Sequence, residues 1–139
     1  PNIRYELNGY TYTTDSFGRI QRAEFDDLIN RPKGRGRLEI EDSKYAIGRG
    51  EWRLDDERGH VIADRFGGDN TMANIVPQSK YANHGAISEI ENEMAIALNE
   101  GKRVSGSIEL SYSGSSYRPT EFTYSYDIGD GMIVTHIKN

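Results

Sequence analysis

The chain has 139 residues, 35% of them hydrophobic and 15 of them glycine, which fits one loop-rich domain with a compact core. It contains no cysteine, which excludes disulfides, thiolate metal sites and a cysteine nucleophile, and no run approaches the roughly 18 apolar residues of a membrane span. The formal net charge of -5 argues weakly against nucleic-acid binding, because phosphate partners usually attract basic domains.

The start of the chain, Pro1-Asn2-Ile3, lacks an initiator methionine and the basic and apolar regions of a signal peptide. We therefore expect residues 1–139 to be a single domain that was processed or excised from a longer protein. A domain of this size is expected to be a monomer by default.

Two or three short strands are predicted before residue 27. Residues 5–12 are rich in β formers, and Asn8-Gly9 within them offers a tight turn. Residues 15–18 give a second turn signal, and residues 19–25 follow as the next strand.

The segment from 30 to 58 is rich in glycine and charge and is predicted to be irregular, with Trp52 as an anchor. It carries a basic strip without acids, followed by further cations: Arg31, Lys33, Arg35 and Arg37, then Lys44, Arg49 and Arg53. The acids gather elsewhere, at Glu24, Asp26 and Asp27 and again at Glu89, Glu91 and Glu93. The basic strip is a solvated loop, a DNA-binding surface or a surface for a separate protein partner, and the sequence leaves these alternatives open.

The clearest predicted element is a helix over residues 86–99. No glycine or proline interrupts residues 86–98, and Gly101 supplies a stop signal just beyond. The apolar side chains form one stripe on the helical wheel, made of Ile87, Ile90, Met94 and Leu98, while Glu89 and Glu93 face away.

Glu91 breaks this pattern because it falls inside the apolar stripe. A carboxylate on a buried face has to be paired, hydrogen-bonded or neutralised. One interpretation is a buried salt bridge, or an acid at the edge of the core whose head reaches solvent. The other is a role at a metal site, which His60 and Asn83 upstream favour.

After Gly101 the chain alternates apolar and polar residues as strands do. The apolar or small positions are Val104, Gly106, Ile108 and Leu110, then Phe122, Tyr124 and Tyr126, and residues 132–135 form a last strand after the turn at 129–131. These segments predict an antiparallel sheet next to the helix, and hence an α+β fold.

The polar residues between 57 and 91 carry the clearest chemistry. One histidine, His60, two asparagines, Asn74 and Asn83, and the carboxylate of Glu91 stand at a loop-to-helix junction. They supply a base, a neutral oxygen ligand for a hard metal and a further acid. Those are the parts needed to hydrolyse a phosphodiester with one divalent ion.

The same stretch resembles the DNA/RNA non-specific endonucleases of the His-Me finger (ββα-metal) superfamily. That family has an Asp-Arg-Gly-His signature, then Asn-x-x-Pro-Gln, then Asn-x-Gly leading into a helix with a glutamate. This chain has Glu57-Arg58-Gly59-His60, Asn74-Ile75-Val76-Pro77-Gln78, Asn83-His84-Gly85 and Glu91. The flanks at 8–15, 18–20, 60–68 and 117–122 resemble one branch, the compact nuclease domains at the C-termini of bacterial secreted polymorphic toxins.

The resemblance implies a ββα-metal core and assigns a role to each of these residues. His60 is the general base that activates water, oriented by a backbone carbonyl. Asn83 is the direct ligand of Mg²⁺, for which Mn²⁺ can substitute, and Glu91 reaches the metal through a water. Asn74 supports the site through hydrogen bonds.

Other readings of single residues stay open. Asn83 could equally be a helix N-cap, and Asn74 a turn residue before a buried strand. Arg58 is expected either near the phosphate or in a supporting ion pair. His84 has no role in the family and is expected to be exposed to solvent.

The chain departs from the family pattern in two places. The acid that opens the signature is Glu57, where the family has aspartate. The family's separate catalytic arginine cannot be assigned, since Arg49 and Arg53 both qualify. Arg118, before Pro119, is either structural or a contact to the substrate backbone, which makes Arg49, Arg53 and Arg118 the candidate substrate contacts.

As a whole, the resemblance implies a metal-dependent, sequence-non-specific endonuclease for DNA, with RNA possible in principle. It also implies a toxin domain that is secreted from a bacterium, delivered into target cells and inhibited by a cognate immunity protein. The alternatives are a free secreted nuclease for nutrition or spreading, without an inhibitor, and a catalytically silent binding module on the same fold. Three histidines and no cysteine argue against a structural zinc module.

Overall fold

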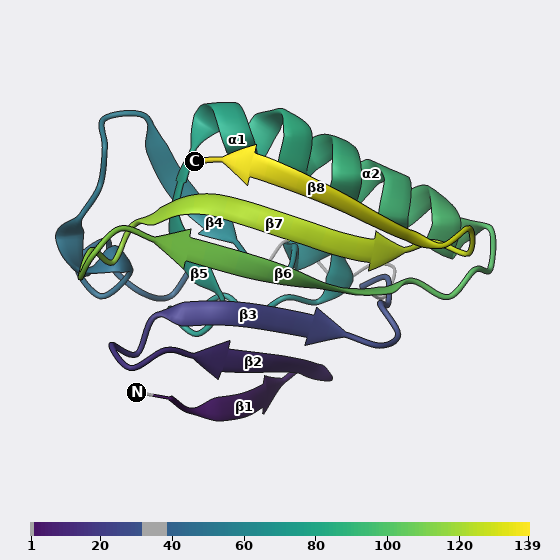
Figure 1. Ribbon diagram of the computed structural model, residues 1–139, viewed down its shortest axis with the longest axis horizontal. Coiled ribbons are helices and arrows are strands. Elements are labelled where there is room, and N and C mark those ends of the chain that lie inside the picture. Colours follow the sequence, from purple (N-terminus) through teal and green to yellow (C-terminus); the bar gives the residue numbers. More distant parts are fainter. Residues whose placement is uncertain (1, 32–38) are drawn as a thin grey trace.

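The computed structural model describes residues 2–31 and 39–139 (Figure 1). Pro1 and the strip residues Lys33, Arg35 and Arg37 lie outside the described residues. Within the described ranges, the chain forms a six-stranded sheet, a two-stranded sheet and two α-helices. Neither of these helices has the length and apolarity needed to cross a membrane.

The larger sheet joins the two ends of the chain. Its strands are antiparallel and follow the order β1-β2-β3-β6-β7-β8. Their bounds are β1 Arg4–Leu7, β2 Tyr10–Thr14, β3 Ile20–Phe25, β6 Ser105–Tyr112, β7 Pro119–Asp127 and β8 Met132–Lys138. The strands predicted at both ends are confirmed, whereas the β3–β6 pairing that merges them into one sheet was not predicted.

Two tight turns shape the N-terminal half of this sheet. Asn8 and Gly9, between β1 and β2, have φ angles of 55° and 88°, as a type I′ hairpin requires. In the next turn, the Asp15 carboxylate accepts hydrogen bonds from the backbone N–H groups of Phe17 and Arg19, each at 3.0 Å. Both predicted turns are therefore confirmed.

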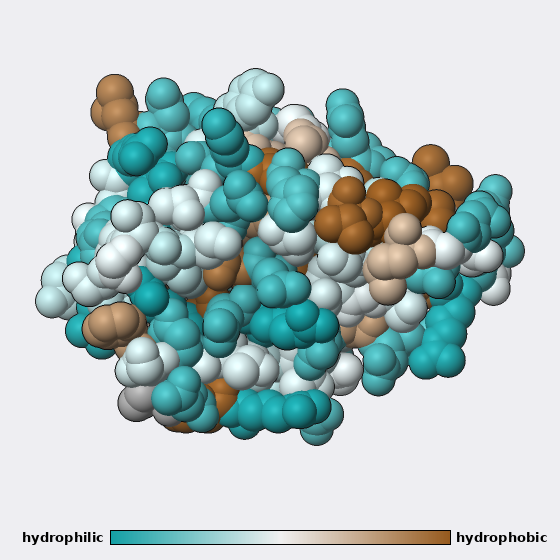
Figure 2. Space-filling model, in the orientation of Figure 1, coloured by the Kyte–Doolittle hydropathy of each residue, from teal (hydrophilic) through white to brown (hydrophobic). Residues whose placement is uncertain are grey.

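One face of the larger sheet forms the core with α2 and the segment after β4. Alternate strand residues enter this core, and Tyr12, Phe122 and Tyr124 are fully buried there. The intervening strand residues are mostly threonine, serine and charged residues. Figure 2 shows a largely hydrophilic surface with a hydrophobic patch over β8, a strand whose exposed apolar residues are Met132 and Val134.

A smaller unit packs against this sheet and consists of a hairpin and two helices. Its bounds are β4 Asp56–His60, β5 Ile75–Ser79, α1 Lys80–His84 and α2 Ala86–Asn99. Ser79 caps α1, because its hydroxyl accepts a hydrogen bond from the Ala82 backbone N–H at 3.1 Å. Gly85 joins the helices at a point where an added Cβ would overlap the carbonyl oxygen of Tyr81. The long helix was predicted and is confirmed; α1 was not predicted.

The two faces of α2 differ slightly from the prediction. Ile87, Ile90 and Met94 are buried and Leu98 is half-buried, as the stripe requires. Glu89 is exposed, but the expectation that Glu93 faces away is wrong. Glu93 is half-buried because it packs beside β7, where its carboxylate accepts a hydrogen bond from the Tyr126 hydroxyl at 3.2 Å.

The prediction that residues 30–58 are irregular is confirmed for residues 39–55 and wrong for residues 56–58, which belong to the strand β4. The only helical turn within residues 39–55 is the 3-10 helix η1, Gly48–Gly50. Trp52 is half-buried and anchors this stretch, since its indole N–H donates to the carbonyl oxygens of Lys44 and Ile47 at 2.8 and 3.0 Å. A second 3-10 helix, η2, spans Asp64–Phe66 after β4.

Candidate active site

His60 ends β4 and is half-buried. Its Nε2 lies 2.5 Å from the side-chain oxygen of Asn70, a buried residue in the loop between β4 and β5. If the Asn70 oxygen accepts this hydrogen bond, the proton sits on Nε2 and Nδ1 is the basic nitrogen. The expected orienting group was a backbone carbonyl, and the structure has the Asn70 amide there instead. Nothing in the sequence around Asn70 marks it out.

Asn74 stands directly before β5 and is completely buried. Its Oδ1 accepts hydrogen bonds from the Tyr12 hydroxyl at 2.6 Å and the Ile62 backbone N–H at 3.0 Å. Its Nδ2 donates to the carbonyl oxygens of Ile62 and Asp69, both at 2.9 Å. All four hydrogen-bonding positions of the amide are filled, so Asn74 ties the segment after His60 to the large sheet and has no group left for substrate.

Glu57, Asn83 and His84 form a polar cluster between β4 and α1. One carboxylate oxygen of Glu57, Oε1, accepts a hydrogen bond from Asn83 Nδ2 at 3.0 Å and lies 2.6 Å from His84 Nε2. The hydrogen bond from Asn83, aided by His84 and Lys80, holds the pKa of Glu57 below its usual value. Glu57 is therefore an anion at neutral pH. Asn83 lies in the last turn of α1, and the N-cap of the predicted long helix α2 is Gly85, so the N-cap reading of Asn83 is wrong.

The free oxygens of this cluster fit a hard divalent ion. Neither Glu57 Oε2 nor Asn83 Oδ1 has a hydrogen-bond partner among the residues that the structure describes. Mg²⁺ is commonly held by one or two protein oxygens and keeps most of its waters. Over the same residues, no three His, Asp or Glu side chains are grouped closely enough to enclose a metal. The donor set thus suits a largely hydrated cation and not a closed structural zinc site.

Glu91 faces the core, as its place on the apolar stripe predicted. It lines a cavity of about 10 Å³ together with apolar residues of α2, the large sheet and the segment after β4. Burial raises the pKa of Glu91 to about 7, and the charge of Arg65 opposes that rise only in part. No salt bridge or hydrogen bond to Glu91 exists within residues 2–31 and 39–139, so the salt-bridge reading finds no partner there. The buried Tyr124 hydroxyl lines the same cavity and is also unpartnered.

The comparison with known proteins agrees with this arrangement. The family model of the DNA/RNA non-specific endonucleases matches residues 1–130. The chain belongs to this family. Nucleic-acid phosphodiester hydrolysis is therefore its class of reaction.

Two further comparisons describe the relatives of this endonuclease. The type VII secretion system proteins EssD of Staphylococcus aureus strains USA300 and NCTC 8325 / PS 47 are each 37% identical over 146 residues. The match covers 99% of this chain and 23% of each EssD, so the chain spans about a quarter of the relatives' length. The solved structure of Sda1 nuclease with bound zinc ion has a TM-score of 0.65 at 16% identity, over 93% of this chain and 75% of that one. That likeness concerns the fold, and the expected α+β, ββα-metal fold class is confirmed.

Gln78, from the family motif, is a site residue that the sequence reasoning did not single out. It is the ladder partner of Glu57 on β5 and is fully buried. An added Cβ on Gly59 would overlap the Gln78 side chain, so the endonuclease needs glycine at this position. Both polar atoms of the Gln78 amide lack a partner in the described part of the chain. A buried amide without a protein partner costs free energy, so apolar packing alone does not account for glutamine at this position.

Arg118 is buried and has a structural role in this endonuclease. Its Nε and one terminal nitrogen donate to the two carboxylate oxygens of Asp56 at 2.7 and 2.8 Å. Burial opposes ionisation of Asp56, but these hydrogen bonds outweigh it and lower the pKa of Asp56. Both the guanidinium and its partner are withdrawn from solvent. The engaged and buried guanidinium favours the structural reading of Arg118 over a contact to the substrate.

The other three arginines differ in their surroundings. Arg58 is exposed on β4, two residues before His60, and has no ion pair in the described residues. Arg53 is exposed and borders a surface depression that Arg118 also lines. Arg49 is exposed on η1, with its guanidinium 4.6 Å from the ring centre of Tyr117. Arg58 and Arg49 are thus free to meet a phosphate.

Proposed function

We propose that this endonuclease is metal-dependent and cleaves DNA without sequence preference, with RNA as a second substrate. The observation that carries the proposal is the Glu57–Asn83 pair, which presents two uncommitted oxygens on the hairpin that also holds His60. His60 is fixed through one ring nitrogen, which leaves the other for proton transfer.

In the proposed reaction, His60 takes a proton from the attacking water. Arg58 offers a positive charge to the phosphate from the same face of β4. Asn83 and Glu57 would hold Mg²⁺ or Mn²⁺, which supplies charge neutralisation at the phosphate and the leaving oxygen. Glu91 is proposed to reach that ion through water, and Asn74 and Asn70 hold the loop that positions His60.

The groups of this site address phosphate and not base edges, so substrate choice should be broad. His60 activates water and does not need a 2′-hydroxyl, so DNA is as good a substrate as RNA. Binding that depends on phosphate contacts weakens as salt rises.

We also propose that the chain is the nuclease domain of a longer secreted toxin. Its similarity to one part of a type VII secretion system protein supports this. Such a toxin would be delivered into target cells, and the producing cell would need an immunity protein against it. A free secreted nuclease would lack that inhibitor, so an inhibitory protein encoded next to the full-length gene separates the two alternatives.

The decisive experiment is cleavage of supercoiled plasmid and of a structured RNA with Mg²⁺, Mn²⁺, Zn²⁺ or EDTA. Wild type is compared with His60→Ala and with His136→Ala, which removes an exposed histidine on β8. We expect metal-dependent cleavage by wild type and His136→Ala and a loss of at least about a hundredfold in His60→Ala. Intact substrates in every metal would instead indicate a silent binding module, and equal cleavage by His60→Ala would remove the assigned base.

A further inference from the structure

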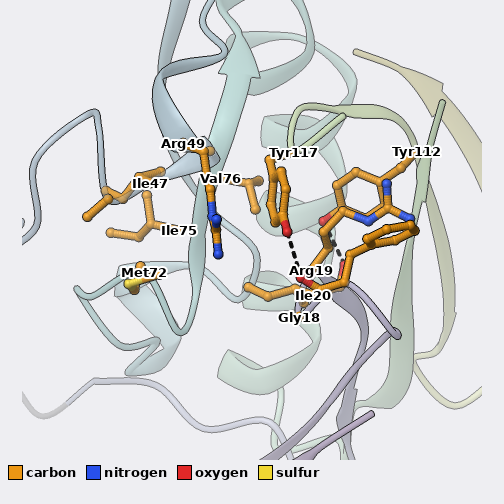
Figure 3. A pocket seen from close by; sticks show the side chains of 13 residues that line it. Gly18, Arg19, Ile20, Ile47, Arg49, Met72, Ile75, Val76, Tyr112 and Tyr117 are labelled. Atoms are coloured by element: carbon orange, nitrogen blue, oxygen red, sulfur yellow. Dashed lines mark hydrogen bonds between the residues drawn. The ribbon is translucent and has the colours of Figure 1, made fainter. Parts of the chain in front are cut away.

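A second cavity lies beside β5, between the β2–β3 turn and η1. Its volume is about 190 Å³, below the several hundred Å³ of a typical drug-sized ligand site and suited to a single flat group. Figure 3 shows the Arg49 guanidinium between Tyr117 on one side and the aliphatic side chains of Ile47, Ile75 and Met72 on the other.

The rim of this cavity combines exposed apolar groups with an uncompensated cation. Phe17 and Met72 are 48% and 53% exposed although both are large and hydrophobic. Arg49 has no carboxylate partner within the described residues. Arg19, the other cation of the cavity, is fully engaged, since Asp15 and the carbonyl oxygens of Gly114 and Ser116 hold its guanidinium.

The backbone of Arg49, at the rim of this cavity, is in a strained conformation. Arg49 has a φ of 52°, a left-handed conformation that is uncommon for a residue with a side chain. Its neighbours Gly48 and Gly50 have φ angles of 68° and 78°. An added Cβ on Gly48 would overlap the Pro77 ring, so η1 lies directly on β5. The fold therefore fixes the backbone of η1, from which the Arg49 guanidinium reaches the Tyr117 ring.

The cavity is lined by both Ile75 and Val76, and through Ile75 it reaches the face of the hairpin that carries His60. Ile75, which is 2% exposed and forms part of the cavity wall, is the ladder partner of His60. Residues directly opposite each other in an antiparallel pair project to the same face, with Cβ atoms about 5 Å apart. A group in the cavity and a phosphate at His60 can thus belong to one nucleotide strand.

We propose that this cavity takes a nucleobase of the substrate next to the scissile phosphate, with the base packed between the Arg49 guanidinium and Met72. The proposal rests on the proposed nuclease function and names its substrate subsite. Packing against a guanidinium and a thioether accepts every base, which agrees with cleavage that lacks sequence preference. Because a base has to leave its stack to enter, single strands and frayed ends are preferred over intact duplex.

The test compares two ligands with the same phosphates, tetrathymidylate and a tetramer that lacks all four bases. Binding of fluorescent forms is measured by anisotropy with Mg²⁺ in the His60→Ala protein, which does not cleave them. We expect the ligand with bases to bind about tenfold more tightly, as stacking of one base provides. Adding Arg49→Gly or Met72→Glu should reduce this preference to less than about threefold.

Both variants are chosen to keep the fold, because glycine accepts the φ of Arg49 and Met72 is exposed. Arg4→Ala, which removes an exposed arginine on β1, is the matched control and should leave the preference unchanged. An equal preference for bases in all four proteins would overturn the cavity proposal while the nuclease function stands. Absence of binding to both tetramers, together with no plasmid cleavage by wild type, would refute the nuclease function itself.

Discussion

The amide of Gln78 is buried in the candidate site at a cost in free energy. It is fully buried, it lies against Gly59, and neither its oxygen nor its nitrogen has a partner among the described residues. The free energy of folding would be more favourable with an apolar side chain of the same length, since an unpaired buried amide costs about 1–3 kcal/mol. Our hypothesis is that the Gln78 amide binds a water or a ligand next to the Glu57 carboxylate during catalysis.

We therefore predict that Gln78→Met separates stability from activity. Methionine has similar length and no polar atoms to desolvate, so the free energy of unfolding should stay equal or rise by about 1 kcal/mol. Plasmid cleavage should fall about tenfold, as for the loss of one hydrogen bond to a bound species. Gln21→Met, an exposed position on β3, is the control for both measurements. Full activity in Gln78→Met would show that the amide serves packing alone.

Glu91 gives a prediction with a defined pH window. Burial raises its pKa from 4.5 to about 7, so between these values the folded state binds a proton that the unfolded state has lost. Stability therefore falls as pH rises through this window, by at most about 3 kcal/mol. Glu91→Gln stays neutral at every pH. In EDTA it should be about 1–3 kcal/mol more stable than wild type at pH 8 and equal to it near pH 4.

Urea unfolding at the two pH values measures this difference, with Glu89→Gln on the exposed side of α2 as the control. Cleavage by Glu91→Gln should need more Mg²⁺ than wild type, because the proposed water-mediated contact is weakened. A variant that is less stable than wild type at pH 8 would point to a buried ion pair that the described residues do not contain.

Among the elements, the β2–β3 turn both stabilises the large sheet and positions Arg19 at the cavity beside β5. Asp15 accepts two backbone hydrogen bonds and the Arg19 Nε–H at 2.7 Å, and Arg19 lines the cavity beside β5. Burial of Asp15 opposes its ionisation, but the hydrogen bonds from Arg19 and Phe17 prevail and lower its pKa. The carboxylate thus stabilises the fold above the pKa of the unfolded chain, near 3.9, and this contribution is lost as pH falls through the folded pKa.

Asp15→Asn should accordingly lower the free energy of unfolding by about 1–3 kcal/mol at pH 7. The difference from wild type should stay constant down to about pH 4 and shrink below it, as wild type itself is protonated. Denaturant unfolding at pH 7, 4 and 2.5 follows this change. Asp130→Asn, in the exposed turn before β8, should match wild type at each pH. A gap of equal size at pH 7 and 2.5 would mean that the charge of Asp15 contributes nothing.

The elements also show what the sequence can predict. Turn residues and two-residue alternation are local signals, so the strands at both ends and α2 were predictable. The β3–β6 pairing links strands far apart in the chain, and no local pattern encodes it. For the candidate site, the motif marks His60, Asn74 and Asn83, because their spacing is fixed within one hairpin and helix. Asn70 and the partner of Arg118, Asp56, were not predicted, because loop closure and burial decide these contacts.

At the scale of the whole molecule, the net charge of -5 is unfavourable for binding a polyanionic substrate. The distribution of charge along the chain explains how such a substrate can bind, because not all of the described arginines are neutralised by acids. Arg49 and Arg58 have no acidic partner in the described residues, whereas Arg19, Arg31 and Arg118 are each paired with an aspartate. The proposed site offers two of these cations, Arg58 and Arg49, to phosphate, so electrostatics should contribute only a small part of the affinity.

This distribution predicts a shallow salt dependence. With about two phosphates neutralised, the logarithm of the affinity of His60→Ala for duplex DNA should fall with the logarithm of salt concentration at a slope of about -2. Arg58→Ala and Arg49→Gly should each reduce the slope by about one, and Arg4→Ala should not change it. Anisotropy titrations at several salt concentrations give the slope directly. A slope of about -5 or steeper would mean that further cations, such as Arg53 or the strip of Lys33, Arg35 and Arg37, also contact DNA, since each further neutralised phosphate adds about one to it.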